Sequence, residues 1–177
     1  MPGASASLPP ISQAELIDRR RRVGAHLADH GIQGAVVTDP ANVQYLGGFA
    51  LTQPWVSRTR PTFAVLGPDG LLTVVASGQV SLDDPPVDAV VTYGSPADAP
   101  ATVAGVLARI GVGGGPVAAE RGQEHRLGIT VEEFAELEQV HGAAFRDAGP
   151  ALWAARIIKS AAEVDRLRAA FAVCDRI

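Results

Sequence analysis

One loop combines side chains that could bind a ligand. Residues 50–60 read ALTQPWVSRTR and carry Gln53, Trp55, Arg58 and Arg60. Aromatic and cationic groups in one connecting segment suit a ligand or partner surface, because loops held by a rigid scaffold often carry function. The sequence therefore predicts that binding chemistry lies in this loop.

The histidines do not form a convincing metal site. His26 and His30 are four residues apart in a predicted helix, a spacing that can place two imidazoles on one metal. No cysteine lies nearby, and both occupy the last turns, where a cation favourably meets the helix dipole. His125 and His141 lack partners at ligand spacing and are predicted to be surface groups. The sequence thus predicts no metal ligand.

Three further patterns are predicted to be structural. Asp83 and Asp84 stand beside two prolines, as turn residues do. The glycine-rich residues 111–116 follow a predicted helix and open a strand, whereas a phosphate-binding loop must follow a strand and open a helix. The four arginines at 19–22 wind around a helix and are predicted to form a solvated face. Nucleotide binding is therefore not expected.

Composition describes an ordinary globular chain. Its 177 residues suffice for one domain, 47% of them are hydrophobic, 19% are charged, and the net charge is −4. That charge gives no reason to expect nucleic acid or an anionic membrane. Cys174 is the single cysteine, is predicted to pack on a helical apolar stripe, and fits a reducing compartment. With no signal peptide or membrane span expected, the predicted location is the cytoplasm.

The chain is organised around residues 34–49. A short apolar run ending at Val37 predicts a buried strand. Asp39 is suited to cap a new helix, and Pro40 fits its first position because its missing N–H would be unpaired there. A pair of glycines at 47–48 then predicts the helix end.

The remaining patterns predict alternating strands and helices. A helix is capped by Ser12, a hairpin turns at residues 67–70, and capping boxes begin at Thr130 and Ser160. The pattern predicts further helices at 97–110, 130–142 and from 160, and strands at 87–93, 116–120 and 143–148. We expect an α/β three-layer sandwich, with a mainly mixed central sheet flanked by helices. The last apolar stripe still runs at residue 177, which predicts a boundary inside a longer protein.

Three motifs in this order resemble the N-terminal domain of the creatinase, prolidase and Xaa-Pro aminopeptidase ("pita-bread") family. They are GIQGAVVTDPANVQYLGGF at 31–49, RPTFAVLGPDG at 60–70, and ARIIKSAAEVDRLRAAFAVCDRI at 155–177. Matching positions are Asp39, Asn42, Tyr45, Leu46, Gly48 and Phe49 in the first motif, and Arg156, Ile158, Lys159, Ser160, Glu163, Leu167 and Arg168 in the last.

The resemblance implies a domain with a ribonuclease H-like motif and a division of the chain. The small residues and prolines of residues 1–10 predict a disordered tail, because they bury too little apolar area to offset ordering. By the resemblance, residues 11–155 would be the creatinase/prolidase N-terminal domain and 156–177 the start of a linker helix to a catalytic domain missing from this chain. A C-terminal catalytic domain would hold two divalent metal ions, Mn, Co or Zn. This chain would then hold no cofactor and hydrolyse nothing, but would cover the active site and help to form a homodimer.

The resemblance also assigns possible substrate contacts. Arg60 matches an arginine that reaches the substrate carboxylate in creatinase-like members, and a guanidinium suits that bidentate contact. Arg58 lies one alternation away and could exchange roles with Arg60. Trp55 is either a pocket wall or a core or interface anchor. The substrate would be a small peptide or an amidine.

Three functions remain open at this stage. The first is a substrate-capping and oligomerisation domain of a metal-dependent hydrolase, most often an Xaa-Pro aminopeptidase or prolidase, or a creatinase-like enzyme. The second is a non-enzymatic interaction module of a pseudo-peptidase. The third keeps a downstream metal site but changes the chemistry, for instance to C–N hydrolysis of an amidine or to a lyase reaction.

Overall fold

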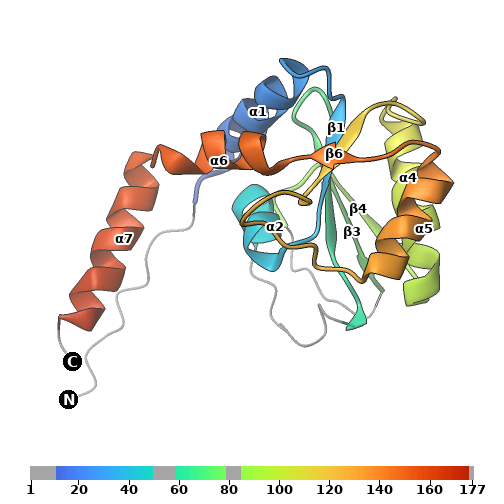
Figure 1. Ribbon diagram of the computed structural model, residues 1–177. Helices are drawn as coiled ribbons and strands as arrows, with labels where there is room; N and C mark the ends of the chain where they lie inside the picture. The colour runs from blue at the N-terminus through green and yellow to red at the C-terminus, as the bar shows by residue number, and fades with distance from the viewer. Residues whose placement is uncertain (1–10, 50–58, 79–84, 176–177) are drawn as a thin grey trace.

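The computed structural model describes residues 11–49, 59–78 and 85–175 of the chain. Both strands and helices form along these segments, and within the described residues three of the strands follow one another without a helix between them (Figure 1). In order they are α1 (Gln13–Ala28), β1 (Gly34–Val37), α2 (Pro40–Gly47), β2 (Phe63–Leu66), β3 (Leu72–Ser77), β4 (Ala89–Tyr93), the 3₁₀ turn η1 (Pro96–Asp98), α4 (Ala99–Arg109), β5 (Val117–Ala119), α5 (Val131–His141), β6 (Arg146–Asp147), α6 (Gly149–Ile157) and α7 (Ala161–Cys174).

The strands form one mixed sheet in the order β4-β3-β2-β1-β5-β6. β2 runs antiparallel to both of its neighbours, β1 and β3. The other pairs, β1 with β5, β5 with β6 and β3 with β4, are parallel. The carboxyl ends of β1, β5 and β6 therefore point to the same side of the sheet, and open α/β sheets commonly bind ligands at the carboxyl ends of their strands.

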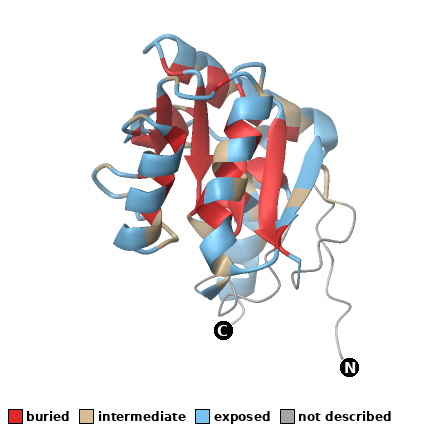
Figure 2. Ribbon diagram, turned by 90° about the vertical axis from the view of Figure 1, so that its right-hand side faces the viewer, coloured by how far each residue is buried: buried red, intermediate tan, exposed pale blue. Residues whose placement is uncertain are grey.

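Helices cover both faces of the sheet. One apolar core joins α1, α2 and α6 to the first face, through residues such as Val23, Leu46 and Leu152. A second core joins α4 and α5 to the other face, through residues such as Leu107 and Leu137. Buried residues gather on the strands and on the inner sides of the helices (Figure 2). The predicted three-layer α/β sandwich is confirmed.

Local signals in the sequence explain several element ends. Asp39 accepts hydrogen bonds from the backbone N–H groups of Ala41 and Asn42 and begins α2. Gly48 ends α2 with φ at +73°, in the left-handed region that glycine enters without strain. Full capping boxes form at Thr130 and Ser160. Ser12 also caps its helix, by accepting a hydrogen bond from the backbone N–H of Glu15.

The four arginines at 19–22 were expected to form a solvated face, and this expectation is wrong for two of them. Arg19 and Arg20 are 4% and 2% exposed. Arg20 donates hydrogen bonds to the backbone oxygens of Leu46 and Pro86, and Arg19 pairs with two carboxylates described below. A guanidinium has five N–H donors, so it can be buried where backbone oxygens and acids surround it. The spacing of apolar residues along α1 does not show that these acceptors, which belong to other segments, pack against it.

The histidine prediction needs a similar correction. His141 is 6% exposed, and its Nε2 lies 3.0 Å from the backbone oxygen of Gly115. Its ring also packs against Phe145 with 5.3 Å between centroids. His125 is half-buried in the site described next. Both are therefore parts of the packed structure and not free surface groups.

The chain ends in two helices of different character. α6 was not predicted as a separate element; it packs on α1 and runs across residue 155, where the sequence placed a domain boundary. α7 projects from the body of the molecule, and none of its described residues is buried (Figure 1). Cys174, which was predicted to pack, is exposed. Among the helices described, none is long and apolar enough to cross a membrane.

Candidate functional site

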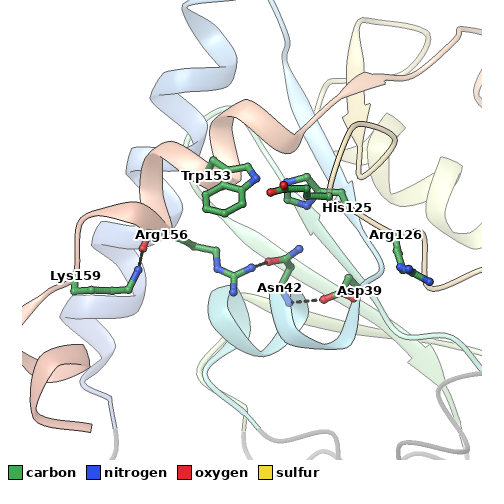
Figure 3. A pocket seen from close by; sticks show the side chains of 8 residues that line it. Asp39, Asn42, His125, Arg126, Trp153, Arg156 and Lys159 are labelled. Atoms are coloured by element: carbon green, nitrogen blue, oxygen red, sulfur yellow. Dashed lines mark hydrogen bonds between the residues drawn. The ribbon is translucent and has the colours of Figure 1, made fainter. Parts of the chain in front are cut away.

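A pocket of about 350 Å³ opens at the carboxyl ends of β1 and β5. The turn into α2, the loop after β5, α6 and the α6–α7 connection all contribute to its wall (Figure 3). A pocket of this size suits a small ligand.

A buried carboxylate fixes the floor beneath the pocket. Glu120, immediately after β5, is 1% exposed. Its Oε2 accepts hydrogen bonds from the backbone N–H groups of Thr38 (2.7 Å) and Asp39 (2.8 Å). Its Oε1 accepts one from the Asn42 side-chain amide at 2.6 Å. Burial raises the pKa of the Glu120 carboxyl, and these hydrogen bonds oppose that shift. Glu120 thus ties the end of β5 to the end of β1.

Asn42 links Glu120 to α6 through hydrogen bonds on both sides of its amide group. While its amide group donates to Glu120, its Oδ1 accepts a hydrogen bond from Nη1 of Arg156. The Arg156 guanidinium also lies 5.7 Å from the centre of the Tyr45 ring. A strand end, the first turn of α2 and the last turn of α6 are therefore held in one polar chain. This chain orients Arg156 at the pocket wall.

The loop after β5 is held against the end of β1 by a close approach. Gly128 donates its N–H to the Thr38 hydroxyl at 2.9 Å, and a Cβ at Gly128 would lie 2.2 Å from the Thr38 backbone oxygen. At the other end, Oδ1 of Asp147 accepts hydrogen bonds from the N–H groups of Gly122 and Gly149. These contacts fix the loop relative to the first turn of α6.

His125 and Trp153 form one side of the pocket. Figure 3 shows the two side chains beside each other, and their rings meet edge to face with 6.3 Å between centroids. Nε2 of His125 is buried and has no hydrogen-bond partner among the described residues. Gly149 leaves room for the imidazole, because a Cβ there would lie 2.8 Å from His125 Cδ2. A buried polar atom without a partner is unusual in a folded protein.

Cations outnumber acids around the opening. Arg126, Arg156 and Lys159 line the pocket together with the carboxylates of Asp39 and Glu124. Lys159 donates to the backbone oxygen of Arg156, whereas Arg126 is exposed and makes no hydrogen bond or ion pair with the described part of the chain. The pocket therefore favours a ligand that carries negative charge.

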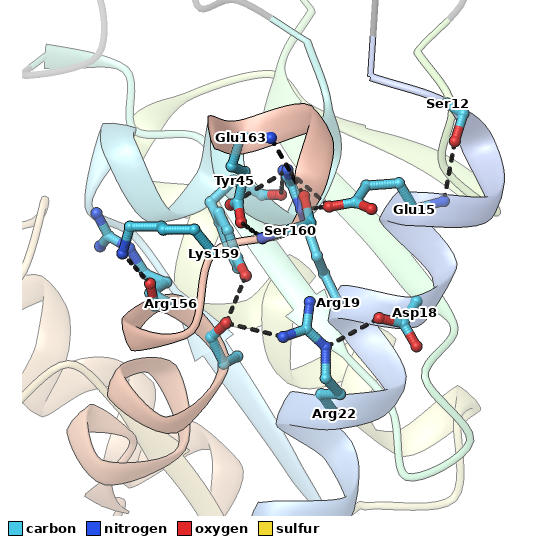
Figure 4. Close-up of polar contacts among 11 residues, drawn as sticks. Ser12, Glu15, Asp18, Arg19, Arg22, Tyr45, Arg156, Lys159, Ser160 and Glu163 are labelled. Carbon is cyan, nitrogen blue, oxygen red and sulfur yellow. Dashed lines mark hydrogen bonds and ion pairs between the residues drawn. The ribbon is translucent and has the colours of Figure 1, made fainter. Parts of the chain in front are cut away.

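A second cluster of polar side chains attaches α7 to the rest of the domain (Figure 4). Arg19 on α1 pairs with Glu15 and with Glu163 of α7, at 3.2 Å in each case. Its guanidinium lies 4.5 Å from the Tyr45 ring centre, and the Tyr45 hydroxyl donates to the backbone oxygen of Ala155 at 3.0 Å. α1, α2, α6 and α7 thus meet at one place beside the pocket.

The profile of the creatinase/prolidase N-terminal domain family matches residues 19–158 of this sequence. The match covers most of the chain. This chain belongs to the creatinase/prolidase N-terminal domain family. The match includes Asn42, Glu120, His125 and Arg156, and it ends before α7.

Solved structures share the fold of this creatinase/prolidase N-terminal domain. Dipeptidase PepE from Mycobacterium ulcerans has a TM-score of 0.67 and 22% identity over 89% of this chain and 40% of its own. Recombinant prolidase from Thermococcus sibiricus has a TM-score of 0.63 and 19% identity over the same shares. This chain therefore spans about two fifths of the length of these proteins. A comparison with curated proteins finds no match.

A shorter solved structure corresponds to the domain alone. It is the N-terminal creatinase/prolidase-like domain of a putative metallopeptidase from Corynebacterium diphtheriae, with a TM-score of 0.52 and 19% identity over 75% of this chain. The match covers 94% of that structure. Identities at this level show the fold alone.

Among the predicted substrate contacts, the described residue Arg60 does not line this pocket. Arg60 is half-buried just before β2, near Tyr93, while Trp55 and Arg58 lie outside the described residues. Burial and Glu133 raise the pKa of Tyr93 to about 12, and the charge of Arg60 acts in the opposite direction. The roles of Arg60, Arg58 and Trp55 in substrate binding stay predictions.

Sequence reasoning gave no role to most residues of the pocket. Asn42, Arg156 and Lys159 were noted only as motif positions, and Glu120, Arg126 and Trp153 were not noted as site residues. One signal was available, because Thr38 follows a predicted buried strand, Glu120 ends another predicted strand, and the carboxyl ends of parallel strands lie on the same side of a sheet. No group of three or more His, Cys, Asp or Glu side chains among the described residues could hold a metal ion.

Proposed function

We propose that this domain is the N-terminal substrate-capping and oligomerisation part of a metal-dependent hydrolase. The favoured activities are those of an Xaa-Pro aminopeptidase or prolidase, or of a creatinase-like enzyme. In this proposal the two divalent metal ions and the catalytic residues belong to a C-terminal domain outside this chain. The chain alone is catalytically inactive.

The family match over residues 19–158 carries this proposal. Two longer structures with the same fold are described as a dipeptidase and a prolidase, and the domain from Corynebacterium diphtheriae belongs to a putative metallopeptidase. The described residues do not provide a metal-binding cluster, so they do not fit a catalytic metal ion. No catalytic step is assigned to this chain.

Within this proposal the domain would complete a substrate site in the assembled enzyme. Arg60 is the favoured clamp for a substrate carboxylate, with Arg58 as the alternative and Trp55 as a wall. Homodimer formation through this domain would bring these groups to a neighbouring subunit. The expected substrate is a small peptide, with an amidine as the second choice.

A non-enzymatic interaction module is the alternative. It is favoured by apolar side chains exposed on α6, α7 and their connection, including Trp153 (47% exposed), Ile158 (73%) and Phe171 (66%). In a pseudo-peptidase such a surface would bind a partner protein, and the downstream metal ligands would be missing. The complete gene sequence distinguishes the two, because the hydrolase requires those ligands.

The experiment is an activity assay on the product of the complete gene. The protein is treated with chelator, then given Mn²⁺, Co²⁺ or Zn²⁺, and assayed with an Xaa-Pro dipeptide and with creatine. Metal-dependent release of the N-terminal residue supports the peptidase. A folded protein that binds metal but turns over neither substrate contradicts both favoured activities, and a folded protein that binds no metal favours the interaction module.

A further inference from the structure

We infer that the pocket at the carboxyl ends of β1 and β5 is a receptor for a single carboxylate group, and that it has room for a bound portion of about amino-acid size. This binding role goes beyond the proposed function, because it requires neither a catalytic domain nor metal ions. It rests on described residues other than the predicted substrate contact Arg60.

The wall of the pocket carries more positive than negative charge. Arg126, Arg156 and Lys159 bring three cations to a pocket with two acids, Asp39 and Glu124. One oxygen of Asp39 is already occupied by the backbone N–H groups at the start of α2. Arg156 donates a hydrogen bond from Nη1 to the side-chain oxygen of Asn42. The other N–H groups of its guanidinium remain able to bind a second acceptor. A carboxylate is the acceptor that a guanidinium binds most specifically.

His125 indicates the same ligand independently of the charge of the wall. Nε2 of His125 is buried within the pocket wall without a hydrogen-bond partner in the described structure. The ring is held in place by Trp153 on one side and by the glycine backbone at 149 on the other. A ligand oxygen in the pocket would give this nitrogen a partner as a hydrogen-bond donor. The requirement for a partner and the positive wall thus indicate the same kind of ligand.

The side chains of the pocket wall are also held in place before a ligand binds. Arg156 is fixed by Asn42, and Asn42 is fixed by the buried Glu120. The loop that carries His125 and Arg126 is held at Gly122 and Gly128. Side chains fixed before binding lose less conformational freedom when a ligand arrives. The half-exposed Trp153 offers an apolar surface for the remainder of the ligand.

The carboxylate could come from a free small molecule or from a side chain or terminus of a second copy of this chain. Propionate and its neutral isostere propionamide provide a matched pair of probes. The isotopically labelled 177-residue chain is titrated with each at constant ionic strength, and the NMR resonances of the His125 ring and the Trp153 indole N–H are followed. The titration is repeated after dilution of the protein.

Three variants locate the site. Arg126→Met removes a cation that has no partner in the described structure, so it should leave folding intact. Arg156→Met removes the cation held by Asn42. Arg109→Met is the matched control, because Arg109 is exposed at the end of α4 on the opposite face of the sheet.

For a free carboxylate, propionate should shift both resonances to saturation, and propionamide should not. Arg126→Met should weaken this binding about tenfold, as expected for loss of one charge-assisted hydrogen bond, and Arg109→Met should leave it unchanged. If a second copy provides the carboxylate, the resonances should instead change on dilution, and Arg126→Met should abolish that change. Equal shifts with both probes, unaltered binding in both pocket variants, or no change with probe or dilution would each overturn the inference.

Discussion

At the scale of single residues, the most constrained group is the carboxylate of Glu120. It accepts hydrogen bonds from two backbone N–H groups and from the side chains of Thr38 and Asn42, and Glu120 itself is 1% exposed. Such a buried network is stable only when each member has its partner. The sequence predicted the strand that ends beside Glu120, but not its partners, which lie about eighty positions away in the chain.

Replacement of Glu120 by Gln should destabilise the domain. The new NH₂ group must face donors where an oxygen accepted hydrogen bonds, so a loss of about 1–3 kcal/mol in the free energy of unfolding is expected at neutral pH. Denaturant unfolding of Glu120→Gln measures this loss. The exposed Glu136→Gln on α5 is the control and should remain within about 0.5 kcal/mol of wild type.

The same carboxyl predicts a pH dependence. Because the folded state raises the pKa of Glu120, the folded protein binds more protons than the unfolded chain between the ordinary value of 4.5 and the raised value. The stability contributed by this group should therefore be lost as pH rises through that interval. The difference in the free energy of unfolding between wild type and Glu120→Gln should become smaller as pH increases from about 4.5. A difference that becomes larger over this range would show that ionisation of Glu120 stabilises the fold.

Arg60 gives a prediction for the assembled enzyme. If it contacts the substrate carboxylate, Arg60→Ala in the complete gene product should reduce kcat/KM by an amount equivalent to about 1–3 kcal/mol. The thermal midpoint should stay near that of wild type. Arg109→Ala serves as the control. An unchanged kcat/KM for Arg60→Ala would exclude Arg60 from the substrate site.

At the scale of elements, local signals located most helices and strands. Asp39, Thr130 and Ser160 each cap the predicted helix, because capping depends on residues only three positions apart. α6 lacked a side-chain cap and was missed. The burial of Arg19 and Arg20 was also missed, because it depends on acceptors in α2, in α7 and in the segment before β4.

The contact between α1 and α7 should depend on Glu163. Its carboxylate pairs with the buried Arg19, which keeps Glu15 as its other partner. Glu163→Gln should therefore cost about 1–2 kcal/mol of stability and increase hydrogen exchange in the first turn of α7. Asp165→Asn breaks an exposed pair with Arg168 on the same helix and should change little. Equal effects of the two substitutions would contradict a specific role for Glu163.

The packing of α2 against α1 gives a second test at this scale. Gly48 and Gly142 both end helices with positive φ, so alanine at either position should cost about 1 kcal/mol. Only at Gly48 would the new Cβ meet a buried side chain, 2.4 Å from Leu16 Cδ1. Gly48→Ala should thus be more destabilising by about 1–3 kcal/mol in chemical unfolding. Similar losses for the two variants would show that Leu16 moves aside freely.

At the scale of the whole molecule, the order of strands and helices was sufficient to predict the layered sheet, and three sequence motifs were sufficient to recognise the family. The pocket was harder to predict, since its wall joins residues from α2, the loop after β5 and α6. These segments follow three different strands, β1, β5 and β6, so they are far apart in the sequence and meet only in the folded domain. The shared family explains the domain's architecture, and its task in a longer protein is the proposal made above.

The most direct test compares this chain with the complete gene product. Both are incubated with Mn²⁺, Co²⁺ or Zn²⁺ and assayed for hydrolysis of an Xaa-Pro dipeptide at equal molar concentration. The proposal predicts metal-dependent turnover by the complete product and none by the 177-residue chain. Turnover by the chain alone at a comparable rate would contradict the account, because it would place a catalytic centre within this domain.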